Sequence, residues 1–188
     1  MNCVLLYSLI GAGLLMMILE SCGVPVTLKL SFKGDIKRES QWLAQYGQAV
    51  CTTIAVLLVW KLDPSRHYAK WAIASASVGA SVVSFFIKRI TGRVRPNREH
   101  AGQFLGPTLK HDNARESFPS SHSASAMALS VSLAILYPQA AGIFWTLGIT
   151  CAILRYLMDA HWPSDVLIGI ALGYASGFLA VQYCLKMT

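Results

Sequence analysis

Charged side chains are scarce in this sequence. They make up 13% of its 188 residues, about half of the roughly 25% that is usual for a soluble domain. This scarcity argues against a soluble globule, and a hydrophobic content of 54% excludes a disordered chain. Cysteine is also sparse, since the five cysteines are widely separated and no pair has metal-ligand spacing, which excludes a disulfide scaffold. A small integral membrane protein remains.

Six stretches without Lys, Arg, Asp or Glu come close to the roughly 20 residues that a transmembrane helix needs. They cover residues 2–19, 43–60, 71–87, 123–137, 141–154 and 166–185. We therefore expect an all-α fold, with residues 1–188 forming a single domain that is an integral membrane bundle of six transmembrane helices. Both termini would then lie on one membrane face.

Small residues recur at helical spacing in the last of these stretches. Gly169, Gly173 and Gly177 form two overlapping G-x-x-x-G steps, which let helix backbones approach closely in lipid. We interpret the pattern as packing within one chain and expect a monomer, with a homodimer as the alternative.

The cations are distributed unequally between the two expected membrane faces. Acidic residues number 9 against 16 Lys and Arg, and 12 of these 16 cations fall in segments 20–42, 88–118 and 155–165, which share one face. The other four are Lys61, Arg66, Lys70 and Lys186. The positive-inside rule would make the cation-rich face cytoplasmic, with the cluster after residue 87 as a topology signal or a lipid contact. The alternative is an anion site.

Two further segments on that face favour the anion site. Residues 117–123 read Ser-Phe-Pro-Ser-Ser-His-Ser and open the fourth stretch, where a helix N-terminus would attract phosphate and His122 would lie beside it. His161 precedes the sixth stretch, and Asp165 falls on its first turn. A carboxylate at that position can hold one imidazole nitrogen and raise the basicity of the other.

Each of these residues also has an ordinary structural explanation. An interfacial histidine is usually only hydrogen-bonded, an arginine at a membrane edge usually extends to the headgroups, and an aspartate at a helix start usually caps it. Taken together, however, two histidines, one aspartate and at least three cations converge on one face. Ionisable groups at membrane depth are costly, so such a convergence indicates a functional site.

The residues match three motifs in order along the chain. Lys88 with Arg95-Pro96 fits K-x6-R-P; residues 119–122 fit P-S-G-H except that Ser121 replaces Gly; Arg155, His161 and Asp165 fit S-R-x5-H-x3-D except that Leu154 replaces Ser. This set resembles the signature of the type 2 phosphatidic acid phosphatase superfamily, in its membrane lipid phosphatase branch. The resemblance runs from Lys88 to Asp165, and the expected six-helix core extends it over most of the chain.

The resemblance implies a metal-independent phosphatase that acts through a phosphohistidine and needs no cofactor. His161 would be the nucleophile, Asp165 its orienting partner, and His122 the acid that protonates the leaving oxygen. The groups expected to hold the phosphoryl oxygens are Lys88, Arg95, Arg155, Ser120 and the backbone N–H groups of Ser121 and His122. The carboxylates on this face are also scattered, without the clustering that a two-metal phosphatase requires.

The expected partners are a lipid phosphate or pyrophosphate substrate and the lipid bilayer, with no nucleic acid. By analogy with the superfamily, the protein would lie in a bacterial inner membrane with its site facing the periplasm or the exterior, although the cation distribution indicates the opposite side. The alternatives are a lipid phosphotransferase of the same superfamily, a non-enzymatic anion transporter and a membrane scaffold.

Overall fold

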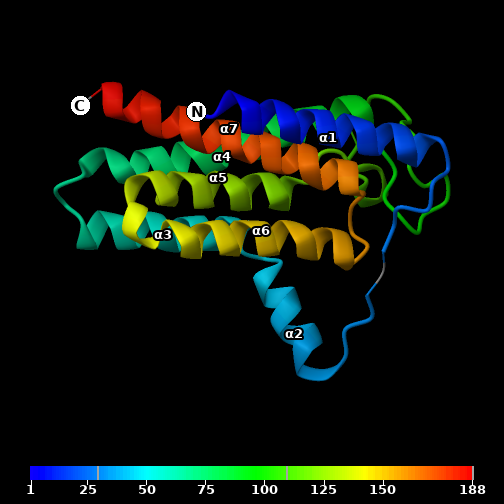
Figure 1. Cartoon of the computed structure of the whole chain (residues 1–188), viewed down its shortest axis with the longest axis horizontal. Coiled ribbons are helices and arrows are strands. Elements are labelled where there is room, and N and C mark those ends of the chain that lie inside the picture. The colour runs from blue at the N-terminus through cyan, green and yellow to red at the C-terminus, as the bar shows by residue number, and fades with distance from the viewer. Residues whose placement is uncertain (29, 109, 188) are drawn as a thin grey trace.

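The chain forms a bundle of α-helices in a computed structural model that describes residues 1–28, 30–108 and 110–187. Lys29, one of the 12 cations assigned to one face, therefore lies outside the described residues. Within them the helices are α1 (Cys3–Ser21), α2 (Gly34–Leu43), α3 (Ala49–Leu62), α4 (His67–Thr91), α5 (Ser121–Leu136), α6 (Ala141–Leu157) and α7 (Pro163–Lys186), with short 3-10 helices η1 (Asn113–Arg115) and η2 (Pro138–Ala140) (Figure 1). The all-α prediction is confirmed.

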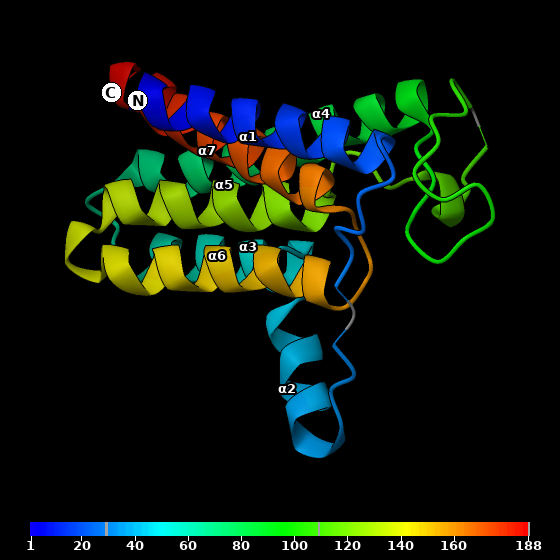
Figure 2. The same ribbon diagram turned by 45° about the vertical axis from the view of Figure 1, so that its right-hand side comes forward.

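The long helices run side by side and alternate in direction (Figures 1 and 2). The two chain termini lie at one end of the bundle, and the long loop that follows α4 lies at the other. At this second end α1, α4 and α6 finish, whereas α5 and α7 begin. We call it the active-site end, because it gathers the three segments that carry the motifs.

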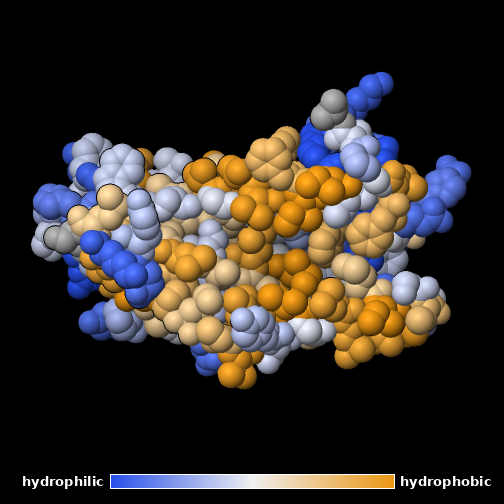
Figure 3. Space-filling view, turned by 90° about the horizontal axis from the view of Figure 1, so that it is seen from above, coloured by the Kyte–Doolittle hydropathy of each residue, from blue (hydrophilic) through white to orange (hydrophobic). Residues whose placement is uncertain are grey.

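Four segments are long and apolar enough to cross a membrane: Cys3–Ser21, His67–Thr91, Pro138–Leu157 and Pro163–Lys186. The other two apolar helices are shorter, with 14 residues in α3 and 16 in α5. At about 1.5 Å per residue they span about 21 and 24 Å, less than the roughly 30 Å of hydrocarbon. Large apolar side chains cover the outside of the bundle, and Figure 3 shows them across its middle, with most hydrophilic side chains toward the two ends.

Helix α5 is the core of the bundle, packed against α4, α6 and α7. Nearly all of its side chains from Ser123 to Leu136 are buried, and many are Ala or Ser, which allow its neighbours to come close. Gly173 faces it directly: a Cβ there would overlap the carbonyl oxygen of Ala124 and lie 2.7 Å from the Cβ of Met127. Gly169 and Gly177 meet α5 in the same way one turn to either side. The prediction that the glycine stripe packs within one chain is confirmed.

Helix α2 has no counterpart among the predicted spans, because only its last residue lies in one. It points away from the bundle, across the direction of the long helices (Figures 1 and 2). Its side chains are mostly exposed, including Ile36 and Trp42. The chain then turns at residues 44–48, so α3 begins at Ala49 and not at residue 43 as predicted. Gly47 in this turn packs against the backbone of His122, where a Cβ would clash.

Candidate active site

Local sequence signals bring the ends of four helices together at the active-site end. Helix α4 stops where Gly92 adopts the left-handed conformation (φ 57°), which glycine adopts without strain. Helix α5 begins after Ser120, whose side chain accepts a hydrogen bond from the N–H of Ser123. Helix α7 begins at Pro163, a residue suited to the first helical position. His161 lies in the short connection between α6 and α7.

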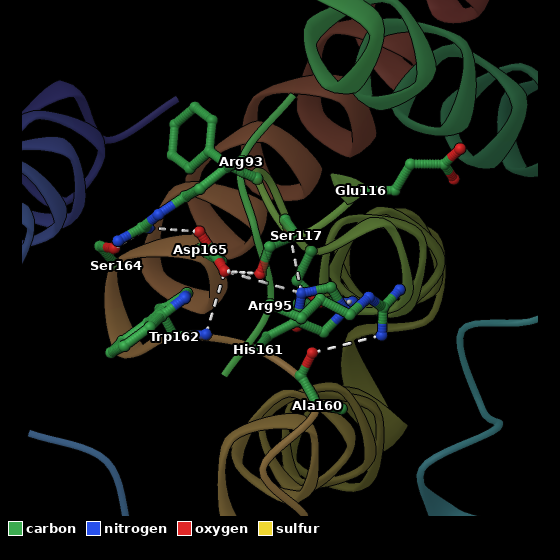
Figure 4. A network of polar contacts seen from close by, with 12 residues as sticks. Arg93, Arg95, Glu116, Ser117, Ala160, His161, Trp162, Ser164 and Asp165 are labelled. Atoms are coloured by element: carbon green, nitrogen blue, oxygen red, sulfur yellow. Dashed lines mark hydrogen bonds and ion pairs between the residues drawn. The ribbon is translucent and has the colours of Figure 1, made fainter. Parts of the chain in front are cut away.

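The imidazole of His161 is buried, with a relative exposure of 2%, and its orientation is fixed from one side. Its Nδ1 lies 2.8 Å from the carbonyl oxygen of Ser117 (Figure 4). A carbonyl can only accept, so Nδ1 carries the hydrogen and the lone pair of the neutral ring is on Nε2. Burial lowers the pKa of His161 to about 3, and the nearby Lys88 and Arg95 act in the same direction. The ring is therefore neutral at pH 7.

Asp165 lies close to this histidine, and Ser117 contacts both residues. Its Oδ2 lies 3.8 Å from His161 Nδ1, beyond hydrogen-bonding distance. The same oxygen accepts a very short hydrogen bond from the Ser117 hydroxyl and another from the backbone N–H of Trp162 at 3.0 Å. The sequence indicated direct contact between this carboxylate and an imidazole nitrogen. In the structure Ser117 stands between them, with its hydroxyl on Asp165 and its carbonyl on His161 (Figure 4).

The three cations of the motifs gather around the two histidines. Lys88 Nζ donates to the carbonyl oxygen of Glu116 at 2.5 Å, and Arg95 Nη1 donates to that of Ala160 at 3.3 Å. Lys88, Arg95 and Arg155 all interact electrostatically with His122. Backbone carbonyls hold Lys88 and Arg95 in place, and three like charges this close together favour an anionic ligand between them.

The start of α5 completes the site. Ser120 is fully buried, and its Oγ accepts from the hydroxyl of Ser123 at 2.9 Å, which leaves its own hydrogen for another acceptor. Ser121 and His122 are the first two residues of the helix, where backbone N–H groups have no intrahelical partner. Both line a cavity of about 380 Å³ beside Gly47. All eight residues singled out in the sequence thus lie at this end of the bundle.

Three polar residues of the site were not singled out in the sequence. Ser117 links Asp165 to His161 as described, and Arg93 and Glu20 form ion pairs behind Asp165. In the sequence, Arg93 falls within the cation cluster after residue 87, and Glu20 is one of the scattered carboxylates on that face. One feature of the sequence could have identified Glu20: it is the lone charged residue in the 19 residues of α1.

Among the described residues, no three His, Cys, Asp or Glu side chains gather as a candidate metal site.

Comparisons with known proteins converge on one family. The model of the PAP2 superfamily matches residues 69–187, which include every motif residue. The lipid A 1-phosphatase of Rhizobium johnstonii is 35% identical over 97 residues, or 51% of this chain and 40% of that protein. This chain therefore spans less than half the length of that relative. The decaprenylphosphoryl-5-phosphoribose phosphatase of Mycobacterium tuberculosis is 28% identical over 138 residues, which covers 72% of this chain and 73% of that one.

One solved structure resembles the whole chain. It is the first transmembrane PAP2 type phosphatidylglycerolphosphate phosphatase from Bacillus subtilis, with a TM-score of 0.60 and coverage of 97% of both chains. The sequence identity is 16%, so this likeness establishes the fold. Together with the four apolar spans, it identifies an integral membrane protein.

Proposed function

We propose that this chain, which belongs to the PAP2 superfamily, removes phosphate from a lipid phosphate or pyrophosphate through a phosphohistidine and without a metal ion. The observation that carries the proposal is the hydrogen bond from His161 Nδ1 to the Ser117 carbonyl. It leaves the lone pair on Nε2, in a ring that is neutral at pH 7, beside three cations. A neutral imidazole with one oriented lone pair is an activated nucleophile.

The reaction takes two steps. In the first, the negative charge of the bound phosphate favours the protonated form of His122. Nε2 of His161 then attacks phosphorus, and the bond from phosphorus to the lipid oxygen breaks while the His122 imidazolium gives that oxygen its proton. In the second, water attacks the phosphohistidine and gives a proton back to His122, and the bond between phosphorus and Nε2 breaks. Phosphate leaves, and both histidines return to their starting states.

Charge stabilisation is the second requirement of this reaction. Phosphoryl transfer develops charge on the equatorial oxygens, and catalysis consists mainly of positioning and neutralisation. Lys88, Arg95 and Arg155 would supply the positive charge. The backbone N–H groups of Ser121 and His122 and the hydroxyl of Ser120 would bind the remaining oxygens, as phosphate binds at other helix N-termini.

A lipid tail has a place beside the phosphate site. The cavity at Ser121 and His122 shares Gly47, Ala49, Ser81 and Ser125 with a mostly apolar groove of about 440 Å³ between α3 and α4. The phosphate of a lipid would thus reach His122 while its chain stays among apolar residues. The two curated relatives are also named for lipid phosphates. We infer that the partners of this chain are a lipid phosphate and the bilayer, and not a nucleic acid.

We further propose that residues 1–188 form one monomeric domain with six spans, in which α3 and α5 complete the set begun by the four longer segments. Both are packed against longer helices, so they need not match the bilayer thickness alone. The domain would lie in a bacterial inner membrane, with the active-site end toward the periplasm or exterior. In a variant that lacks the five native cysteines, a cysteine in place of Thr108 should then react with a membrane-impermeant maleimide in intact cells, whereas protection until lysis would reverse the orientation.

Phosphate release from purified protein tests the function. In detergent with excess chelator, we expect release from at least one member of a panel of lipid phosphates and pyrophosphates. With ³²P-labelled substrate, a short incubation should trap label on the protein in an acid-labile, alkali-stable form. Release that depends on added Mg²⁺ would contradict the metal-free mechanism, and label recovered on a second lipid would identify a phosphotransferase. No release from any substrate, with folded protein, would overturn the proposal.

A further inference from the structure

Arg93 is one of the most buried side chains of the molecule, although it is an arginine at the edge of a membrane bundle. Its side chain is 2% exposed, and its guanidinium contacts two carboxylates. Nη2 lies 2.7 Å from Glu20 Oε2, and Nη1 lies 2.6 Å from Asp165 Oδ1. Nη1 also donates to the hydroxyl of Ser164 at 2.7 Å (Figure 4). Arg93 thus joins the two acids from opposite ends of the sequence.

Glu20 is held as firmly as Arg93. Its side chain is 2% exposed, and its Oε1 accepts from the backbone N–H of Ser164 at 3.0 Å, at the favourable N-terminal end of α7. The rest of α1 is mostly exposed, and Gly13 is its one other deeply buried residue. A buried ion pair contributes little net stability, because desolvation offsets the attraction. Stability alone therefore gives no reason for an otherwise apolar helix to carry this glutamate.

The contacts beyond Arg93 lead directly to the nucleophile. Asp165 places one oxygen on Arg93 and the other on the Ser117 hydroxyl. The carbonyl of Ser117 then accepts the hydrogen of His161 Nδ1. Every atom in this series is buried, so water cannot replace a lost partner. A rotation of the Asp165 carboxylate would move Ser117 and, with it, the imidazole.

We propose that Arg93, clamped by Glu20 of α1, is a positioning residue that fixes Asp165 and, through Ser117, aims Nε2 of His161 at the phosphate. The proposal rests on the proposed role of His161 as nucleophile. An arginine suits this task because its planar fork binds two carboxylates at once in fixed geometry. A lysine carries the same charge but has a single nitrogen, so it would leave one carboxylate poorly oriented.

The experiment compares Arg93→Lys and Glu20→Gln with two matched controls, Arg98→Lys and Glu99→Gln. Both controls lie in the exposed part of the loop that contains Arg93, and the Glu99 side chain is 91% exposed. For wild type and each variant, kcat, KM and the unfolding temperature are measured with the best lipid phosphate. We expect kcat to fall about 10–100-fold in Arg93→Lys and about 10-fold in Glu20→Gln. KM should stay within about twofold of the wild-type value, because a residue that only positions the nucleophile affects the transition state and not the binding of substrate.

Two further measurements distinguish positioning from a purely structural ion pair. The kcat of the double variant should be little lower than that of Arg93→Lys alone, since Arg93 and Glu20 both act through Asp165. The ¹⁵N shifts of His161, assigned by comparison with His161→Asn, should show the Nδ1–H tautomer in wild type and a mixture of tautomers in Arg93→Lys. A lower unfolding temperature with unchanged kcat and unchanged ¹⁵N shifts would overturn the proposal.

The two proposals fail separately. If wild type releases phosphate and both variants keep its kcat, the positioning role is wrong while the phosphatase function stands. If wild type releases no phosphate, the phosphatase function is wrong, and the ¹⁵N shifts alone decide whether Arg93 orients His161. An unchanged tautomer in Arg93→Lys would then refute the positioning role as well.

Discussion

His161→Asn should reduce kcat for phosphate release by about 10⁴-fold or more, because losing a nucleophile removes the covalent path altogether. Asparagine suits the test, since its amide can still donate to the Ser117 carbonyl while offering no basic lone pair in place of Nε2. The fold should therefore survive, as an unfolding temperature close to that of wild type would show. The measurement is steady-state phosphate release, with trapping of ³²P on the protein as a second readout.

The matched control is His111→Asn, which removes a histidine from the exposed loop at the same end of the bundle. The His111 side chain is 74% exposed and contacts Glu116, so we expect activity within about twofold of wild type, as for most surface changes. Near-normal release by His161→Asn would refute the nucleophile assignment. Label still trapped on that variant would assign the covalent step to another residue.

Gly173→Ala should destabilise the protein by about 3 kcal/mol or more, at the upper end of the cost of overpacking. The added Cβ would overlap the Ala124 carbonyl oxygen and lie 2.9 Å from the backbone nitrogen of Ala128. These are backbone atoms of the central helix and cannot rotate away. Separation of α5 from α7 would also move His122 away from His161, so we expect the surviving folded protein to lose activity. Thermal unfolding in detergent measures the first effect.

Gly11→Ala is the control for this change, because a Cβ at Gly11 in α1 meets no atom within 4 Å. Replacing an interior helical glycine with alanine generally stabilises by about 0.5–1 kcal/mol. The same substitution should therefore have opposite effects in the two helices. Equal unfolding temperatures for Gly173→Ala and wild type would mean that α5 and α7 do not approach as closely as described.

Much of the architecture follows from the sequence, because lipid imposes simple rules. Hydropathy located the apolar helices, and the glycine spacing located a close helix contact on α7, although it did not identify α5 as the partner. Helix α2 was missed since ten residues with mixed charge have no membrane-spanning signal. The start of α3 was also misplaced, because apolar composition continues through the turn at residues 44–48, which is set by the packing of Gly47 on α5.

The residues of the candidate site likewise divide into those that the sequence could identify and those that it could not. His122, His161 and the three cations could be chosen from motif spacing, since each belongs to a short run of sequence. Arg93 and Glu20 could not, because their partners lie 72 and 144 residues away, at Asp165 and Ser164. The role of Ser117 was hidden for another reason: its backbone carbonyl orients His161, and backbone geometry leaves no trace in residue identity.

The contact between Glu20 and Ser164 also has a consequence for biosynthesis. The first and the last membrane helices meet there, at a sequence separation of 144 residues, and a contact of such high sequence separation forms late in folding. During synthesis the ribosome releases α1 long before α7. Glu20 can therefore contact Ser164 only after four other apolar helices have entered the bilayer. Under the proposed mechanism, the nascent chain therefore cannot release phosphate before α7, which carries Asp165, is inserted.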